Sequence, residues 1–166
     1  MNTINIKEIK EAFNNGSHCS GAYGFVAFVE NKTKAVKIFK KNHTREQAKK
    51  VFESEVQAYE LIQENEKLRS ITPTFFGKVT IDKEESEEDD LSLDLSLNLY
   101  FEFAYLMSCE VGTFIKLENI DDRDEYEKII TLFNEHGIKH VKDSSVILND
   151  DKVKMVIDFA MKEFPL

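Results

Sequence analysis

The chain has 166 residues, of which 42% are apolar and 13 are Phe, which is enough to fill the core of one domain. Its formal net charge of -9 argues against a nucleic-acid partner, because binding to a phosphate backbone needs clustered Lys and Arg. Two cysteines are too few for a disulfide framework, and no apolar run is long enough to span a membrane. These features predict a soluble cytoplasmic protein, or one delivered into a host cytosol by a specialised secretion system.

The periodicity of the first third of the chain predicts a helix, a hairpin and a second helix. Apolar residues recur at helical spacing in the first segment and become typical of strands in the next. Thr44 and Gln47 fit a capping box, which marks the start of a helix. The expected elements are a helix over 5–13, strands over 25–30 and 34–39, and a helix after Thr44 with the inward stripe Ala48, Val51, Phe52, Glu55, Tyr59 and Ile62.

The tight turn Asn31-Lys32 sets the register of the predicted hairpin. With a two-residue turn, Val26 lies opposite Lys37, and opposite residues of two strands share one face of the sheet. The Lys37 side chain is therefore expected beside Val26 and just below Gly24.

Glu55 lies on the buried side of the predicted second helix. A carboxylate in that position is costly unless it is paired, and Lys37 on the preceding strand is the nearest candidate. The alternative is that Glu55 lies at the margin of the stripe and extends its carboxylate to water.

The rest of the chain predicts further strands and a smaller, mostly helical portion that begins near Val111. The acidic run over 84–90 is expected to be a solvated loop. Gly137 is a natural end for a helix, and Asn149-Asp150-Asp151-Lys152 indicates a hairpin turn. The expected elements are strands over 74–81, 91–97 and 99–104, a helix over 124–136, and strands over 146–148 and 153–157.

Three segments together resemble the protein-kinase superfamily. They are Cys19-Ser20-Gly21-Ala22-Tyr23-Gly24-Phe25-Val26, then Ala35-Val36-Lys37, and finally Val156-Ile157-Asp158-Phe159-Ala160. They are similar to the glycine-rich loop, the lysine strand and the Asp-Phe-Gly turn of that superfamily, with Ala160 in place of the last glycine. The resemblance implies one α+β domain over 1–166, with a five-stranded antiparallel sheet and one main helix in an N-lobe (14–104), and a reduced C-lobe (105–166).

The same resemblance implies roles for individual residues in binding ATP and Mg²⁺. Lys37 would contact the α- and β-phosphates, and Glu55 would fix it by an ion pair. Asp158 would coordinate Mg²⁺. The remaining nucleotide-binding positions would be Gly21 and Gly24 in the loop, Val26 and Ala35 on the strands, Phe101 at the back of the pocket, and Glu102, Phe103 and Ala104 as a hinge that presents backbone groups to adenine.

The segment His140-Val141-Lys142-Asp143-Ser144-Ser145 departs from the catalytic-loop pattern of the superfamily and is shorter. Lys142 stands in the catalytic position, or Asp143 does if the alignment shifts by one residue. The metal-binding Asn is replaced by Val146 or, with slippage, by Ser145. No activation segment or helical substrate platform follows Ala160 in this sequence, so a peptide acceptor would dock elsewhere or on a partner protein.

Three hypotheses follow from the sequence. The first is an active ATP-dependent phosphotransferase, similar to protein Ser/Thr kinases, in which Asp143 orients the acceptor hydroxyl of a protein. The second is a pseudokinase that acts as a binding or regulatory module. The third is an unrelated α+β interaction protein.

Overall fold

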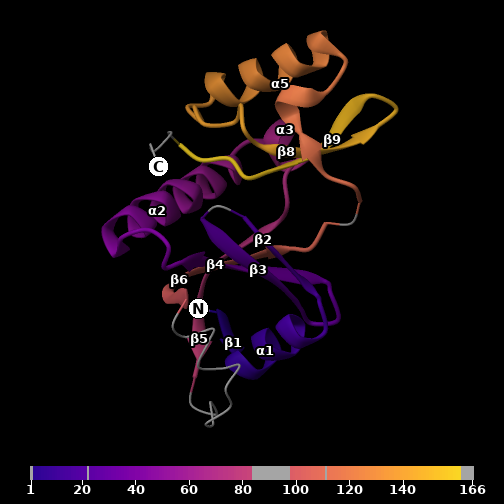
Figure 1. Ribbon diagram of the computed structural model, residues 1–166. Coiled ribbons are helices and arrows are strands. Elements are labelled where there is room, and N and C mark those ends of the chain that lie inside the picture. Colours follow the sequence, from indigo (N-terminus) through magenta and orange to yellow (C-terminus); the bar gives the residue numbers. More distant parts are fainter. Residues whose placement is uncertain (1, 22, 84–97, 111, 162–166) are drawn as a thin grey trace. The chain divides into compact units, whose positions relative to one another are not determined.

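The computed structural model describes residues 2–21, 23–83, 98–110 and 112–161 (Figure 1). The chain divides into two compact units, one made of Met1–Phe52 with Phe76–Cys109 and the other of Glu53–Phe75 with Glu110–Leu166. The predicted acidic loop over 84–90 and strand over 91–97 lie outside the described residues. Among the described helices, none is long and apolar enough to cross a membrane.

The fold is α+β, and its main sheet has six strands in the order β1-β5-β6-β4-β3-β2. The prediction of a five-stranded antiparallel sheet is wrong: among the described residues the predicted strands supply β3, β4, β5 and β6, and two unpredicted strands, β1 and β2, complete the six, with β1 parallel to β5. Its short polar sequence, with only Ile4 buried, gives no alternating pattern to read. The strands are β1 (Asn2–Asn5), β2 (His18–Ser20), β3 (Gly24–Val29), β4 (Lys34–Lys40), β5 (Phe75–Asp82) and β6 (Leu99–Ser108).

The predicted hairpin is confirmed in its register. β3 and β4 are antiparallel, and Val26 lies opposite Lys37. The turn residues Glu30, Asn31 and Lys32 all have positive φ, as tight turns between twisted strands require. Side chains therefore alternate between the two faces of the sheet along both strands.

One face of the sheet packs against helix α1 (Ile6–Asn14), close to the predicted 5–13. Asn5 caps this helix by accepting a hydrogen bond from the Lys7 backbone N–H at 2.8 Å. The core under α1 contains Ile6, Ile9 and Ala12 of the helix together with Phe25, Ala27, Val36, Ile38, Phe101, Ala104 and Leu106 of the strands.

The second helix, α2 (Arg45–Ile62), begins at the predicted capping box. The Gln47 N–H donates to Thr44 Oγ1 at 3.2 Å, and the Thr44 N–H donates to Gln47 Oε1 at 3.1 Å. Its first turns bury Ala48 and Phe52, and the Phe52 ring lies 5.7 Å from the Phe39 ring of β4. The sequence therefore specified both the start and the inward side of this helix.

The second unit holds a three-stranded sheet in the order β7-β8-β9 and helix α5. Gly137 follows α5 with φ +88°, and Asp150 and Asp151 form the two-residue turn between β8 and β9 with positive φ, so both predictions are confirmed. No sequence pattern predicted its shortest elements, α3, β7 and η1. The elements are α3 (Glu66–Arg69), β7 (Ile115–Lys116), η1 (Leu117–Asn119), α5 (Arg123–Glu135), β8 (Ser145–Asn149) and β9 (Lys152–Ile157).

The capping box of α2 predicts that the Thr44 hydroxyl stabilises the fold, and this effect can be separated from that of side-chain size. Replacing Thr44 by Ala removes the acceptor of the Gln47 N–H, and we expect unfolding free energy to fall by about 1 kcal/mol in urea titrations. Thr44→Ser keeps the hydroxyl and should recover most of that loss. Equal destabilisation by both variants would contradict the role of the cap.

Candidate functional site

Lys37 lies on the sheet face opposite the α1 core, and its side chain runs beneath Gly24. It is only 7% exposed, and its Nζ lies 5.2 Å from the centroid of the Phe39 ring. A Cβ built at Gly24 would be 2.6 Å from Lys37 Cε, closer than real Cβ contacts. The expectation that Lys37 projects just below Gly24 is thus confirmed, and this glycine leaves room for the lysine.

Residues of three neighbouring strands share this face of the sheet with Lys37. Val26 is its partner on β3, Tyr105 is its partner on β6, and Ala35 lies two residues before it on β4. Val26 is half-buried, whereas Ala35 and Tyr105 are 2% exposed. Tyr105 was not predicted to lie beside Lys37. Aligning β6 with β4 from the Lys37 position would have identified it.

The glycine-rich loop is tied to its own hairpin. The Gly21 N–H donates to the Gly24 carbonyl oxygen at 2.9 Å, and the Gly21 carbonyl oxygen accepts from Lys40 Nζ at 2.6 Å. Nothing lies within 4 Å of a Cβ built at Gly21. The Gly21 amide is therefore used inside the loop, so a phosphate could take it only if this bond opened.

The predicted positions of Phe101 and of the hinge need correction. Phe101 belongs to the core under α1, on the face away from Lys37, so it does not lie behind a ligand beside Lys37. Glu102, Phe103 and Ala104 lie inside β6, which continues to Ser108. The register jump between Ile38 and Phe39, whose partners are Ala104 and Tyr100, moves 101–103 out of regular pairing, which sequence alternation does not reveal.

Glu102 is bound by a cation on α2. Arg45 Nε lies 3.1 Å from Glu102 Oε2. Partial burial raises the pKa of Glu102, but a backbone hydrogen bond and the charges of Arg45 and Lys41 outweigh it, and the pKa is lowered. Glu102 is therefore held as a surface ion pair.

In the second unit, the predicted catalytic loop and the Asp-Phe-Ala turn face each other across a gap in the ladder. On one side His140 and Ala160 form a β-bridge, with hydrogen bonds of 3.1 and 2.9 Å. On the other side Ser145 pairs with Ile157. The four residues 141–144 thus lie opposite the two residues Asp158 and Phe159. Backbone pairing therefore brings together two segments that are not adjacent in the sequence.

Asp158 adopts a strained backbone conformation at the end of β9. Its φ is +65°, and it lies outside both hairpin turns that account for the other described non-glycine residues of positive φ. Such a conformation costs of order 1–3 kcal/mol and is held only when the surroundings fix it. Here the following residues are fixed, since the Met161 N–H donates to Ser54 Oγ at 3.0 Å and Phe159 is 1% exposed.

Tyr59 connects the two predicted acids of this unit. It lies one helical turn after Glu55 on α2, and its ring centroid is 4.7 Å from that of Phe159, next to Asp158. Glu55 is 6% exposed, which confirms its inward position. Burial, together with the charges of Asp158, Glu55 and Glu110, raises the pKa of Tyr59 well above 10. Several carboxylates therefore gather around one neutral phenol.

Of the other two predicted positions, Asp143 lies within the loop 141–144 and Ser145 follows its end. Asp143 is exposed, and its backbone carbonyl oxygen accepts from Lys116 Nζ at 3.1 Å. Ser145 is half-buried at the start of β8, where it pairs with Ile157, the residue before Asp158. Among the described residues, no group of three or more His, Cys, Asp or Glu side chains could hold a metal ion. Mg²⁺ at this place would need phosphate oxygens as additional ligands.

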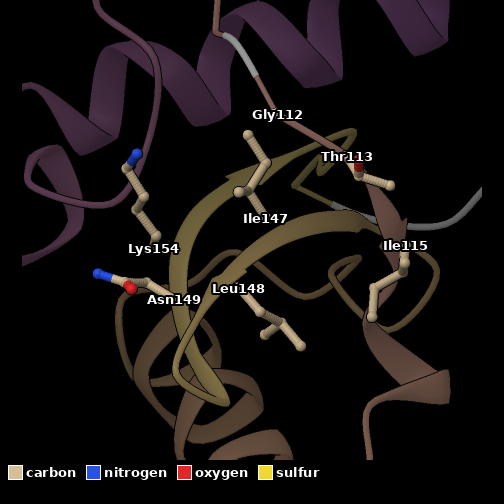
Figure 2. A pocket seen from close by; sticks show the side chains of 7 residues that line it. All are labelled: Gly112, Thr113, Ile115, Ile147, Leu148, Asn149 and Lys154. Carbon is tan, nitrogen blue, oxygen red and sulfur yellow. The ribbon is translucent and has the colours of Figure 1, made fainter.

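An open hollow of about 560 Å³ lies on the β8–β9 hairpin of the same unit (Figure 2). Its walls are mostly apolar, with polar groups from Thr113, Asn149 and Lys154. Gly112 has φ +147°, and a Cβ there would lie 3.0 Å from Ile147, so this glycine allows the wall to close on the strand. No sequence pattern predicted this hollow. The lining residues are Gly112, Thr113, Ile115, Ile147, Leu148, Asn149 and Lys154.

Comparison of the chain with models of known protein families, with curated proteins and with solved structures finds no match. Any function must therefore be argued from the residues of this chain.

The buried phenol of Tyr59 predicts a loss of stability in alkali. Because the pKa of Tyr59 is raised in the folded state, the contribution of its phenol to the free energy of unfolding is complete below pH 10. That contribution is lost as the pH rises through the folded-state pKa. In Tyr59→Phe this contribution is absent, so the fall of unfolding free energy above pH 10 should be shallower by up to about 1.4 kcal/mol per pH unit. Urea titrations between pH 8 and 11 measure it. Parallel profiles for both proteins would refute the assignment.

Proposed function

We propose that this chain is a minimal protein-kinase-like protein that binds ATP with Mg²⁺ and transfers the γ-phosphate to a protein hydroxyl. The observation that carries the proposal is the strained Asp158, which faces the loop of Asp143 between two backbone pairs. Strain of this kind at a carboxylate is a reason to look for function, since a strand end alone does not require it.

The first unit supports the phosphate-binding part. A lysine that is 7% exposed on a strand, with a glycine above it that leaves it space, is an expensive arrangement for structure alone. Lys37 would neutralise charge on the α- and β-phosphates. Val26, which is half-buried, offers a small apolar surface on the same face, where Ala35 is buried.

The second unit supports the metal-binding part and suggests a place for the base. The hollow on β8 falls within the usual size range of small-molecule sites and has apolar walls. From Ser145 to Leu148 the strand advances about 10 Å, a length that suits a nucleotide with its base in the hollow and its phosphates near Asp158. In this arrangement the base would contact Ile147, and not Phe101 and the 102–104 segment.

Transfer would then need few groups. Asp158, with Ser145 beside it, would hold Mg²⁺ on the phosphate oxygens. Asp143 would accept the proton of the acceptor hydroxyl. The hydroxyl oxygen forms a bond to the γ-phosphorus while the bond between that phosphorus and the ADP oxygen breaks. The exposure of Asp143 at the loop tip leaves it open to an acceptor.

A binding or regulatory pseudokinase is the second candidate. Two observations favour it: the Gly21 amide is bonded to Gly24, and Ser145 is a weaker metal ligand than an amide or carboxylate side chain. Such a protein would bind nucleotide without transferring phosphate.

Binding and transfer are tested by separate measurements. ATP with Mg²⁺ at 100 times its dissociation constant should stabilise the fold by about 2.7 kcal/mol, seen as a rise in melting temperature. Lys37→Ala and Asp158→Asn should remove most of that rise. If wild type gives none, nucleotide binding is wrong and the chain is an interaction protein of another kind. Labelled-phosphate transfer that Asp143→Asn abolishes, with binding intact, would support the kinase; binding without transfer would support the pseudokinase.

Two glycines of one loop provide a matched pair of variants. Gly24→Ala places a Cβ 2.6 Å from Lys37 Cε, so the flexible lysine must move, and we expect ATP affinity to fall about tenfold or more with little loss of stability. Gly21→Ala adds the same methyl group where nothing lies within 4 Å and should leave affinity within about twofold. Isothermal titration calorimetry measures both. Equal effects of the two substitutions would show that the space around Lys37 is not used for binding.

A further inference from the structure

Strand β2 forms one outer edge of the six-stranded sheet and pairs with β3 alone. The hydrogen bonds at its two ends define which of its backbone groups point toward β3. The Phe28 N–H donates to the Ser17 carbonyl oxygen at 3.0 Å, and the Gly21 N–H donates to the Gly24 carbonyl oxygen at 2.9 Å. Because backbone groups alternate in direction along an antiparallel strand, residues 17, 19 and 21 are the ones that bond to β3.

The backbone N–H and C=O groups of His18 and Ser20 therefore point away from the sheet. Within the part of the chain that the structure describes, these four groups make no hydrogen bond. The strand also lacks a lysine, a proline and a bulge, which are devices that protect the edges of natural sheets from pairing. The edge of β2 thus offers a row of donors and acceptors to another strand.

The outer edge of the sheet in the second unit differs in this respect. There the Val153 N–H donates to Glu125 Oε2 at 2.7 Å, and the Val156 N–H donates to the Ile71 carbonyl oxygen at 2.8 Å. The chain therefore uses outward N–H groups of β9 itself, whereas it leaves those of β2 open to a partner.

The spacing of the open groups on β2 is self-complementary. When two copies of β2 lie antiparallel with their Cys19 residues opposite each other, His18 of each copy lies opposite Ser20 of the other copy. Four hydrogen bonds then form, two at each pair of His18 and Ser20, and no open group of the strand is left over. Sliding the strands by two residues leaves only one such pair. The matching register has a two-fold axis through the Cys19 pair, which is the usual symmetry of a homodimer.

We propose that this chain forms a weak homodimer by antiparallel pairing of two β2 edges, which joins the main sheets of both copies into one. Cys19 is exposed, forms no disulfide within the chain, and lies on the same face as Val26 and Lys37. Opposite residues share a face, so the two Cys19 side chains lie side by side in the dimer. Their Cα atoms are about 4.5 Å apart in such a pair, which a disulfide can span. Backbone hydrogen bonds supply the attraction, so the dimer is independent of nucleotide and of the phosphotransfer proposed above.

Sedimentation equilibrium in reducing buffer measures the dimer, at protein concentrations up to about 1 mM because a small interface binds weakly. Ser20→Pro removes an N–H that points outward, so the pairing of β2 with β3 is kept while the dimer loses two hydrogen bonds. We expect this variant to raise the dissociation constant about tenfold or more, and Ser20→Ala, which keeps the N–H, to stay within about threefold. A protein that stays monomeric at every concentration, or equal dissociation constants for the two variants, would overturn the proposal.

Disulfide trapping gives a second measurement that leaves the backbone of β2 unchanged. In Cys109→Ser, the oxidant diamide should link two copies through Cys19, as the two thiols give up two protons and two electrons to diamide. The control moves the cysteine by one residue to position 20, which is also exposed, as Cys19→Ser with Ser20→Cys in the Cys109→Ser background. In the proposed register the two copies of position 20 are offset by about 7 Å along the strands, too far for a disulfide, so linkage should be about tenfold slower or less. Equal rates for the two proteins would show random collision and refute the register.

Discussion

The arrangement described here depends on charged groups that the fold keeps away from water. In the first unit Lys37 is almost fully buried on a strand, and in the second Glu55 is buried on a helix. Isolated burial of either charge would cost several kcal/mol, so each implies nearby compensation. Gly24 has no side chain, and a Cβ at this position would occupy space that the lysine fills. A protein selected only for stability would gain by placing apolar residues at these positions.

Strain at Asp158 points in the same direction as the buried charges. Its left-handed backbone turns the chain so that Phe159 enters the core against Tyr59 and Phe133, while the carboxylate stays at the surface. The aromatic packing and the bridge between His140 and Ala160 supply the energy that holds this turn. A rigid core thus orients a polar group, which is how sites are usually built on a scaffold.

Local features were predicted well because they depend on neighbours in the chain. The capping box at Thr44, the register of Val26 with Lys37 and the stop at Gly137 each follow from a few consecutive residues. Errors occurred where pairing partners are distant. β1 is a sheet strand because it pairs with β5, 77 positions later in the sequence, and Phe101 changes its expected face because β6 slips against β4. Alternation along one strand cannot report a slip in the next one.

The sequence by itself determined the main helices and strands around the candidate site, the inward direction of Lys37 and Glu55, and the acid at the end of β9. Turn chemistry, capping and periodicity depend on residues that are close together in the chain, so they can be read directly from the sequence. Only the tertiary structure decided that Tyr59 gathers the carboxylates of the second unit, that residues 141–144 face Asp158, and that a hollow opens beside Ile147. Those relations come from long-range packing and backbone pairing, whose geometry depends on the whole fold of each unit.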